Sequence, residues 1–272
     1  MEYFFKTAND LRVQCEIPIS QVSSNRNNGE FFTTQTLKKL AINVKVGVSY
    51  HSLWLNESII NFMMSAFGKR GASKGIVFHK TSVLRKFGKN NDIGGRDLDY
   101  CWKFAKKFIF NDQDNMFRAE GLHVFPVNYS GSHWVLMVVH FKSSTIYSLD
   151  GYGRMYEDLK SDVMAFLSLA LFSARNTTMS QDGVQHQNIQ DDFPQLGSWK
   201  YKTVDMKVNS TQDDGHNCGV WIVMYALALL LNEDLLLDPE NNSPLWMVND
   251  NINAARVCIF ELILLNTQNN GS

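Results

Sequence analysis

Apolar and polar residues are arranged along the chain in patterns that predict both helices and strands. From Asn56 to Phe67 apolar residues recur at spacings of three and four, which indicates an amphipathic helix with Asn56 as its N-cap. Residues 156–172 show the same helical periodicity. Two further runs, 218–232 and 252–265, are apolar on all sides, a pattern typical of helices in the centre of a domain.

Shorter apolar runs predict strands. We expect one strand over residues 122–127 and a hairpin of residues 134–141 and 145–149, joined by the polar turn at 142–144. Residues 201–208 fit another strand. Because short connections join antiparallel neighbours, the first three strands should form one sheet. The pattern therefore predicts an α+β fold with a central, mostly antiparallel sheet flanked by helices.

Polar segments divide the chain. The stretch around residues 20–29 reads as a loop, so we expect an N-terminal extension over residues 1–31 and one compact domain over 32–272. Within that domain, residues 173–197 are polar and rich in Gln and Asp, which indicates an insertion between elements.

Composition and charge exclude several classes of protein. A net charge of -1 and a pI of about 6.6 give no reason to expect nucleic acid or an anionic membrane as partner. The longest apolar run is shorter than the roughly 18 residues that span a bilayer, and the N-terminus has no signal-peptide pattern. Four cysteines lie far apart without a Cys-x-x-Cys pair, which argues against a zinc site and against a disulfide framework. We expect an intracellular protein without a metal or cofactor.

The hairpin predicts a histidine beside an acid. His133 stands where one strand begins and Asp150 where its partner strand ends, so both lie at the same end of the pair. A carboxylate next to a histidine fixes the tautomer and stabilises the imidazolium, as a general base requires. The pair by itself is also compatible with solvated turn residues.

Cys218 is the candidate nucleophile. It opens an apolar helix after a polar loop, and a helix N-terminus favours the thiolate. Gly219 has no side chain to crowd a substrate, and Gln212 stands six residues upstream, where its amide N–H suits an oxyanion. His216 is close in sequence, but no acid is expected to orient it, so we interpret it as a loop residue.

These residues resemble a known family. GSHWVLMVV with His133, IYSLDGYG with Asp150, and TQDDGHNCGVW with Gln212 and Cys218 are similar in order and spacing to the Ulp/SENP cysteine proteases of ubiquitin-like modifiers. LWLNESIINFMM, residues 53–64, resembles the segment at the start of that family's first helix. The resemblance extends from about residue 32 to about residue 267.

The resemblance implies a papain-like cysteine protease superfold with circularly permuted order: His, Asp, Gln, Cys. It implies a substrate site in which Trp54 and Trp134 close a tunnel over a Gly-Gly tail, with Asn56, Glu57 and Gly219 on the tail-binding face. The implied partner is a modifier of the SUMO, ubiquitin or NEDD8 class. The enzyme would act as a monomer in the cytoplasm or nucleus, or in a host cell if it is a delivered effector.

The sequence departs from the family pattern near the nucleophile and leaves other functions open. Glu57 stands at a usual Asp, Asn217 replaces an acidic residue, and Asp214 takes a common Asn position, so the identity of the modifier is open. A viral-type polyprotein peptidase of the same clan fits the same residues. So does an acetyltransferase that uses a His-acid-Cys arrangement. A non-enzymatic module that binds a modifier tail is a further alternative.

Overall fold

The computed structural model describes part of the 272-residue chain, namely residues 26–27, 30–31, 54–85, 121–167, 198–204, 212–232, 236 and 252–269. The insertion expected at 173–197 lies outside these residues, and the domain boundary expected after residue 31 stays a prediction. Of the helices described, none is long and apolar enough to cross a membrane.

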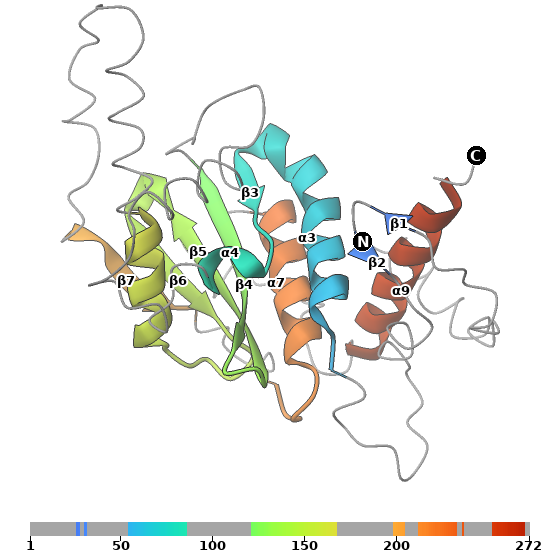
Figure 1. Ribbon diagram of the computed structural model, residues 1–272. Helices are drawn as coiled ribbons and strands as arrows, with labels where there is room; N and C mark the ends of the chain where they lie inside the picture. Colours follow the sequence, from blue (N-terminus) through green and yellow to red (C-terminus); the bar gives the residue numbers. More distant parts are fainter. Residues whose placement is uncertain are drawn as a thin grey trace, which may run out of the picture.

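A five-stranded sheet runs through the molecule in the order β3-β4-β5-β6-β7 (Figure 1). Its strands are β3 (Ile76–Phe78), β4 (Leu122–Tyr129), β5 (His133–His140), β6 (Thr145–Leu149) and β7 (Lys200–Thr203). The central three are antiparallel, as predicted, whereas β3 and β7 each run parallel to their neighbour. The sheet is therefore mixed rather than mostly antiparallel, because both edge strands come from distant segments of the chain and join by crossovers.

Both faces of the sheet are buried. Successive side chains of a strand point to opposite faces. In β5, Trp134, Leu136 and Val138 pack into the core formed with the main helices. Val135, Met137 and Val139 pack into a second core that includes residues of the helix at 157–167. The continuous apolar run of this strand is explained by its burial on both sides.

Two helices cover one face of the sheet. They are α3 (Glu57–Gly71) and α7 (Cys218–Leu231), which contact each other, and α7 also contacts β5 (Figure 1). Asn56 caps α3 as predicted, with its side-chain oxygen accepting the N–H of Ile59 at 3.1 Å. Apart from its C-terminal end, where Leu231 is exposed, α7 is almost entirely buried, also as predicted.

The last helix flanks this layer. Helix α9 (Ile252–Asn269) packs against α7 and contributes Ile252, Ile259 and Ile263 to the core, while Asn253 is exposed. The short hairpin of β1 (Arg26–Asn27) and β2 (Glu30–Phe31) contacts α9 and α3. This arrangement leaves the N-terminus of α7 at the junction of the sheet, α3 and α9.

Candidate active site

A histidine and an aspartate face each other at one end of the β5–β6 hairpin. His133 is the first residue of β5, and Asp150 directly follows β6. Nε2 of His133 lies 2.7 Å from Oδ1 of Asp150. The contact predicted from the hairpin is therefore confirmed, and its geometry follows from the local pairing of the two strands.

Asp150 is buried, and both of its carboxylate oxygens accept hydrogen bonds. The hydroxyl of Tyr156 donates to Oδ2 at 2.7 Å, and the backbone N–H of Tyr152 donates to Oδ1 at 3.1 Å. Burial by itself would raise the pKa of the Asp150 carboxyl, but the hydrogen bonds from His133, Tyr156 and Tyr152 outweigh it and hold the pKa below its ordinary value. The carboxylate stays charged and orients the imidazole.

The side chain of Cys218 also interacts with the His133 ring. Cys218 is the buried first residue of α7 and is within hydrogen-bonding reach of the imidazole. Nε2 of His133 contacts Asp150, so Nδ1 is the ring nitrogen that can form a hydrogen bond with the thiol. Burial would lower the pKa of His133, but hydrogen bonds and charges from Asp150 and Cys218 raise it to about 9. An imidazolium at neutral pH is the partner that a thiolate needs.

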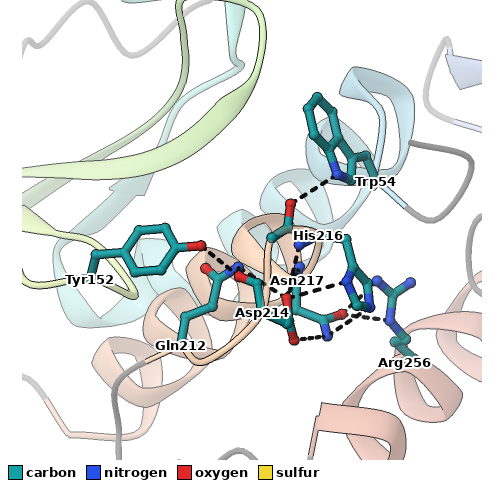
Figure 2. A network of polar contacts seen from close by, with 8 residues as sticks. Trp54, Tyr152, Gln212, Asp214, His216, Asn217 and Arg256 are labelled. Atoms are coloured by element: carbon teal, nitrogen blue, oxygen red, sulfur yellow. Dashed lines mark hydrogen bonds and ion pairs between the residues drawn. The ribbon is translucent and has the colours of Figure 1, made fainter. Parts of the chain in front are cut away.

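The loop before Cys218 folds around the carboxylate of Asp214 (Figure 2). Oδ1 of Asp214 accepts the backbone N–H groups of His216 and Asn217 at 2.9 and 2.8 Å. Nε2 of Gln212 donates to the Asp214 carbonyl oxygen at 2.6 Å and to Oδ1 at 3.2 Å. Gln212 is thus buried near the nucleophile, with its N–H groups directed at Asp214, while its Oε1 has no hydrogen-bond partner among the described residues.

His216 lies beside an acid, contrary to the expectation from the sequence. Its Nδ1 is 3.5 Å from Oδ1 of Asp214, because the loop turns back on itself between the two residues. Its Nε2 is 3.3 Å from Nδ2 of Asn217. Both ring nitrogens face loop groups, whereas His133 stands between a carboxylate and Cys218.

Both tryptophans lie near the start of α7. Nε1 of Trp54 donates to the carbonyl of Gly215 in the nucleophile loop at 3.1 Å (Figure 2). Trp134 is buried, and its Nε1 donates to the carbonyl of Leu55 at 2.8 Å. The structure thus brings both side chains to the surroundings of Cys218, as the resemblance implied.

Three residues expected on the tail-binding face also have structural roles. A Cβ on Gly219 would lie 2.8 Å from Cβ of Leu55 and 3.2 Å from Cδ1 of Trp134, so a glycine is needed for close packing rather than for an open approach. Asn56 caps α3. Glu57 accepts a hydrogen bond from the hydroxyl of Thr81.

Sequence reasoning missed three residues that surround the site. Tyr156 supports Asp150. Tyr152 stacks on His133 with ring centroids 5.3 Å apart, and its hydroxyl donates to the Asp214 carbonyl at 2.5 Å. Arg256 of α9 donates to the side chain of Asn217. Only Arg256 carried a signal, because an arginine inside an apolar helix requires a polar partner.

A buried thiol at a helix N-terminus, beside an imidazole held by a buried carboxylate, is the arrangement of a cysteine-type hydrolase. The model of the Ulp1 protease family, C-terminal catalytic domain, matches residues 53–235, which is more than half of the 272 residues. The chain therefore belongs to the Ulp1 family of cysteine proteases, and the resemblance stated from its motifs is confirmed.

Solved structures share the fold. The C-terminal Ulp1 protease domain in complex with Smt3, the yeast ortholog of SUMO, is 16% identical with a TM-score of 0.56, over 96% of this chain and 95% of that one. The Ulp1-like SUMO protease catalytic domain of Chaetomium thermophilum is 16% identical with a TM-score of 0.58, over 94% and 89%. A search of the curated proteins found no significant match.

Proposed function

We propose that this protein is a peptidase that cleaves after the C-terminal Gly-Gly tail of a ubiquitin-like modifier, with SUMO as the preferred class. The observation that carries the proposal is the His133 ring placed between Asp150 and Cys218. Of the solved structures that share this fold, one is described as a SUMO protease and another is in complex with the yeast ortholog of SUMO, which favours SUMO over ubiquitin. Such modifiers occur inside cells, so we propose action in the cytoplasm or nucleus.

In this proposal Cys218 is the nucleophile and His133 the general base. Nδ1 of His133 holds the proton taken from the thiol, and the thiolate Sγ attacks the carbonyl carbon of the terminal glycine. The C–N bond breaks, and His133 returns the proton to the leaving amine. Water, activated by the same ring, hydrolyses the thioester. Asp150 keeps the ring oriented throughout.

The oxyanion of this reaction needs donors beside Cys218. The backbone N–H of Cys218 and the amide of Gln212 are the proposed donors. In the free enzyme the amide N–H groups of Gln212 are bonded to Asp214. One of them must turn toward the substrate when the oxyanion forms, which makes the conformation of this loop part of the proposed mechanism.

The surroundings of Cys218 support selection of glycine. Trp54 is hydrogen-bonded to Gly215 of the nucleophile loop, and Trp134 is hydrogen-bonded to the carbonyl of Leu55. Between two large aromatic side chains, a tail residue without a Cβ passes with the least steric conflict. We therefore propose that the tryptophans select the Gly-Gly tail, as the resemblance implied.

A panel of activity probes tests the function. SUMO, ubiquitin and NEDD8 would each carry a thiol-reactive group at the C-terminus, and covalent labelling would be measured by mass shift. We expect SUMO to label the wild-type chain fastest and Cys218→Ala to remove the labelling, because the thiol is the reacting atom. A matched SUMO probe ending in Ala-Ala should label far more slowly.

Two outcomes would contradict the proposal. Undiminished labelling of Cys218→Ala would exclude this cysteine as the nucleophile. If none of the three modifiers labels the protein, while a simple alkylating agent still modifies Cys218, the polyprotein peptidase becomes the better interpretation. Faster labelling by ubiquitin would overturn the preference for SUMO and leave the mechanism unchanged.

A further inference from the structure

The carbonyl oxygen of Asp214 accepts hydrogen bonds from two parts of the candidate active site. The hydroxyl of Tyr152 donates to it at 2.5 Å, and Nε2 of Gln212 donates to it at 2.6 Å (Figure 2). A carbonyl oxygen has two lone pairs, so it can accept both donors at once. Tyr152 follows Asp150 by two residues, and its ring stacks on His133. This one oxygen therefore joins the segment of the acid to the proposed oxyanion donor.

The backbone of Gln212 is anchored to the same segment, whereas its side-chain amide has few bonds. The Gln212 N–H donates to the carbonyl of Gly151 at 2.6 Å. The Gln212 side chain packs directly on Gly151, because a Cβ there would lie 2.8 Å from both Cβ and Oε1 of Gln212. Oε1 is buried and has no hydrogen-bond partner among the described residues. Within that part of the chain, the amide is held through Nε2, by Asp214.

Both acceptors that Nε2 of Gln212 uses also have other donors. The carbonyl oxygen of Asp214 has the hydroxyl of Tyr152. Oδ1 of Asp214 has the backbone N–H groups of His216 and Asn217, at 2.9 and 2.8 Å. An acceptor that loses its last donor away from water destabilises the structure. When the Gln212 amide turns away, neither oxygen of Asp214 is left in that state.

We propose that Tyr152 is a positioning residue for the oxyanion donor. Its hydroxyl keeps the Asp214 carbonyl hydrogen-bonded when Nε2 of Gln212 turns from Asp214 toward the oxyanion, and this makes the turn easier. The Tyr152 ring also covers His133, so one side chain acts on the base and on the oxyanion donor. The inference rests on the proposed role of Gln212 in the reaction.

A double-mutant cycle tests this role in turnover. The substrate would be SUMO with a fluorogenic amide at its C-terminus, and kcat and KM would be measured separately. Tyr152→Phe keeps the ring and removes the hydroxyl. We expect kcat to fall about threefold to tenfold with KM nearly unchanged, because the amide turns only when the oxyanion forms. In Gln212→Ala the same substitution should cause no further fall, since no amide is left to turn.

A matched control removes a hydroxyl outside this network. Tyr147 is a buried tyrosine of β6, and Tyr147→Phe should leave both kinetic constants unchanged. An equal fall of kcat when Tyr152→Phe is made in the wild-type chain and in Gln212→Ala would overturn the inference. The hydroxyl would then act independently of the amide.

A second measurement needs no substrate. NMR of the full-length protein labelled with ¹⁵N would follow exchange of the Gln212 side-chain amide protons with solvent, and the signal would be assigned by its loss in Gln212→Ala. In Tyr152→Phe the Asp214 carbonyl has lost its competing donor, so its bond to Nε2 of Gln212 should strengthen. We expect the exchange to slow by about threefold or more.

The two measurements separate the inference from the proposed function. If the wild-type chain turns over none of the SUMO, ubiquitin and NEDD8 substrates, the proposed function fails, and the exchange of the Gln212 amide still decides the effect of Tyr152. Unchanged or faster exchange in Tyr152→Phe would overturn the inference even if SUMO is cleaved.

Discussion

Both oxygens of Asp150 are occupied, and this determines how His133 behaves. Oδ1 receives the imidazole and the N–H of Tyr152, and Oδ2 receives the hydroxyl of Tyr156. A carboxylate with these donors remains charged and cannot rotate freely. The ring of His133 is also covered by Tyr152, which links it to the nucleophile loop through Asp214. The imidazole is therefore oriented before substrate arrives.

We expect the imidazole of His133 to titrate with a pKa of about 9, because Asp150 and Cys218 favour its protonated form against the effect of burial. Since the leaving amine needs this proton, turnover should fall as the pH rises through that value. NMR titration of the ring would measure the pKa directly. In Asp150→Asn the pKa should fall, and an unchanged value there would show that the carboxylate is not its cause.

At the scale of elements, the start of α7 is closely packed at Gly219. Gly219 lies against Leu55, which precedes α3, and against Trp134 of β5. The same Leu55 accepts the indole N–H of Trp134. Three segments distant in the sequence therefore meet one residue after the proposed nucleophile, and a shift in their packing would move Cys218 relative to His133.

Gly219→Ala should destabilise the protein by about 1–3 kcal/mol, because the added methyl group would lie 2.8 Å from Cβ of Leu55. Urea unfolding would measure the loss. Gly68→Ala is the matched control, since Gly68 is inside α3 with nothing within 4 Å of the added carbon. It should stabilise by about 0.5–1 kcal/mol. Equal effects of the two substitutions would contradict the packing argument.

At the scale of the whole molecule, the sheet separates the candidate active site from a second buried polar cluster, formed by two histidines. On the face opposite α7, His79 lies 3.0 Å from Nδ1 of His123 and stacks on Phe125, with ring centroids 4.2 Å apart. Burial, and then the charge of His123, hold the pKa of His79 well below its ordinary value. A neutral His79 is favoured here, and a protonated His79 is disfavoured.

We therefore expect acid to destabilise the protein by protonating His79 in this second core. An unfolded histidine takes up a proton near its ordinary pKa of about 6.5, whereas folded His79 does so only at lower pH. Stability should fall as the pH drops below that value. Urea midpoints at pH 7 and pH 5 would measure the loss, which His79→Gln should reduce. If His79→Gln lost as much stability between pH 7 and pH 5 as the wild-type chain does, groups other than His79 would be the cause of the loss.

The sequence alone determined the elements and the features that depend on neighbours along the chain. Periodicity predicted α3 with its Asn56 cap, and the β5–β6 hairpin predicted the contact of His133 with Asp150, because adjacent strands bring their ends together. Only the tertiary structure decided that Arg256 bonds Asn217, 39 residues away, and that Gly219 packs on Leu55 and Trp134. Periodicity reports which side of an element is buried, whereas these contacts depend on how separate elements are placed against one another.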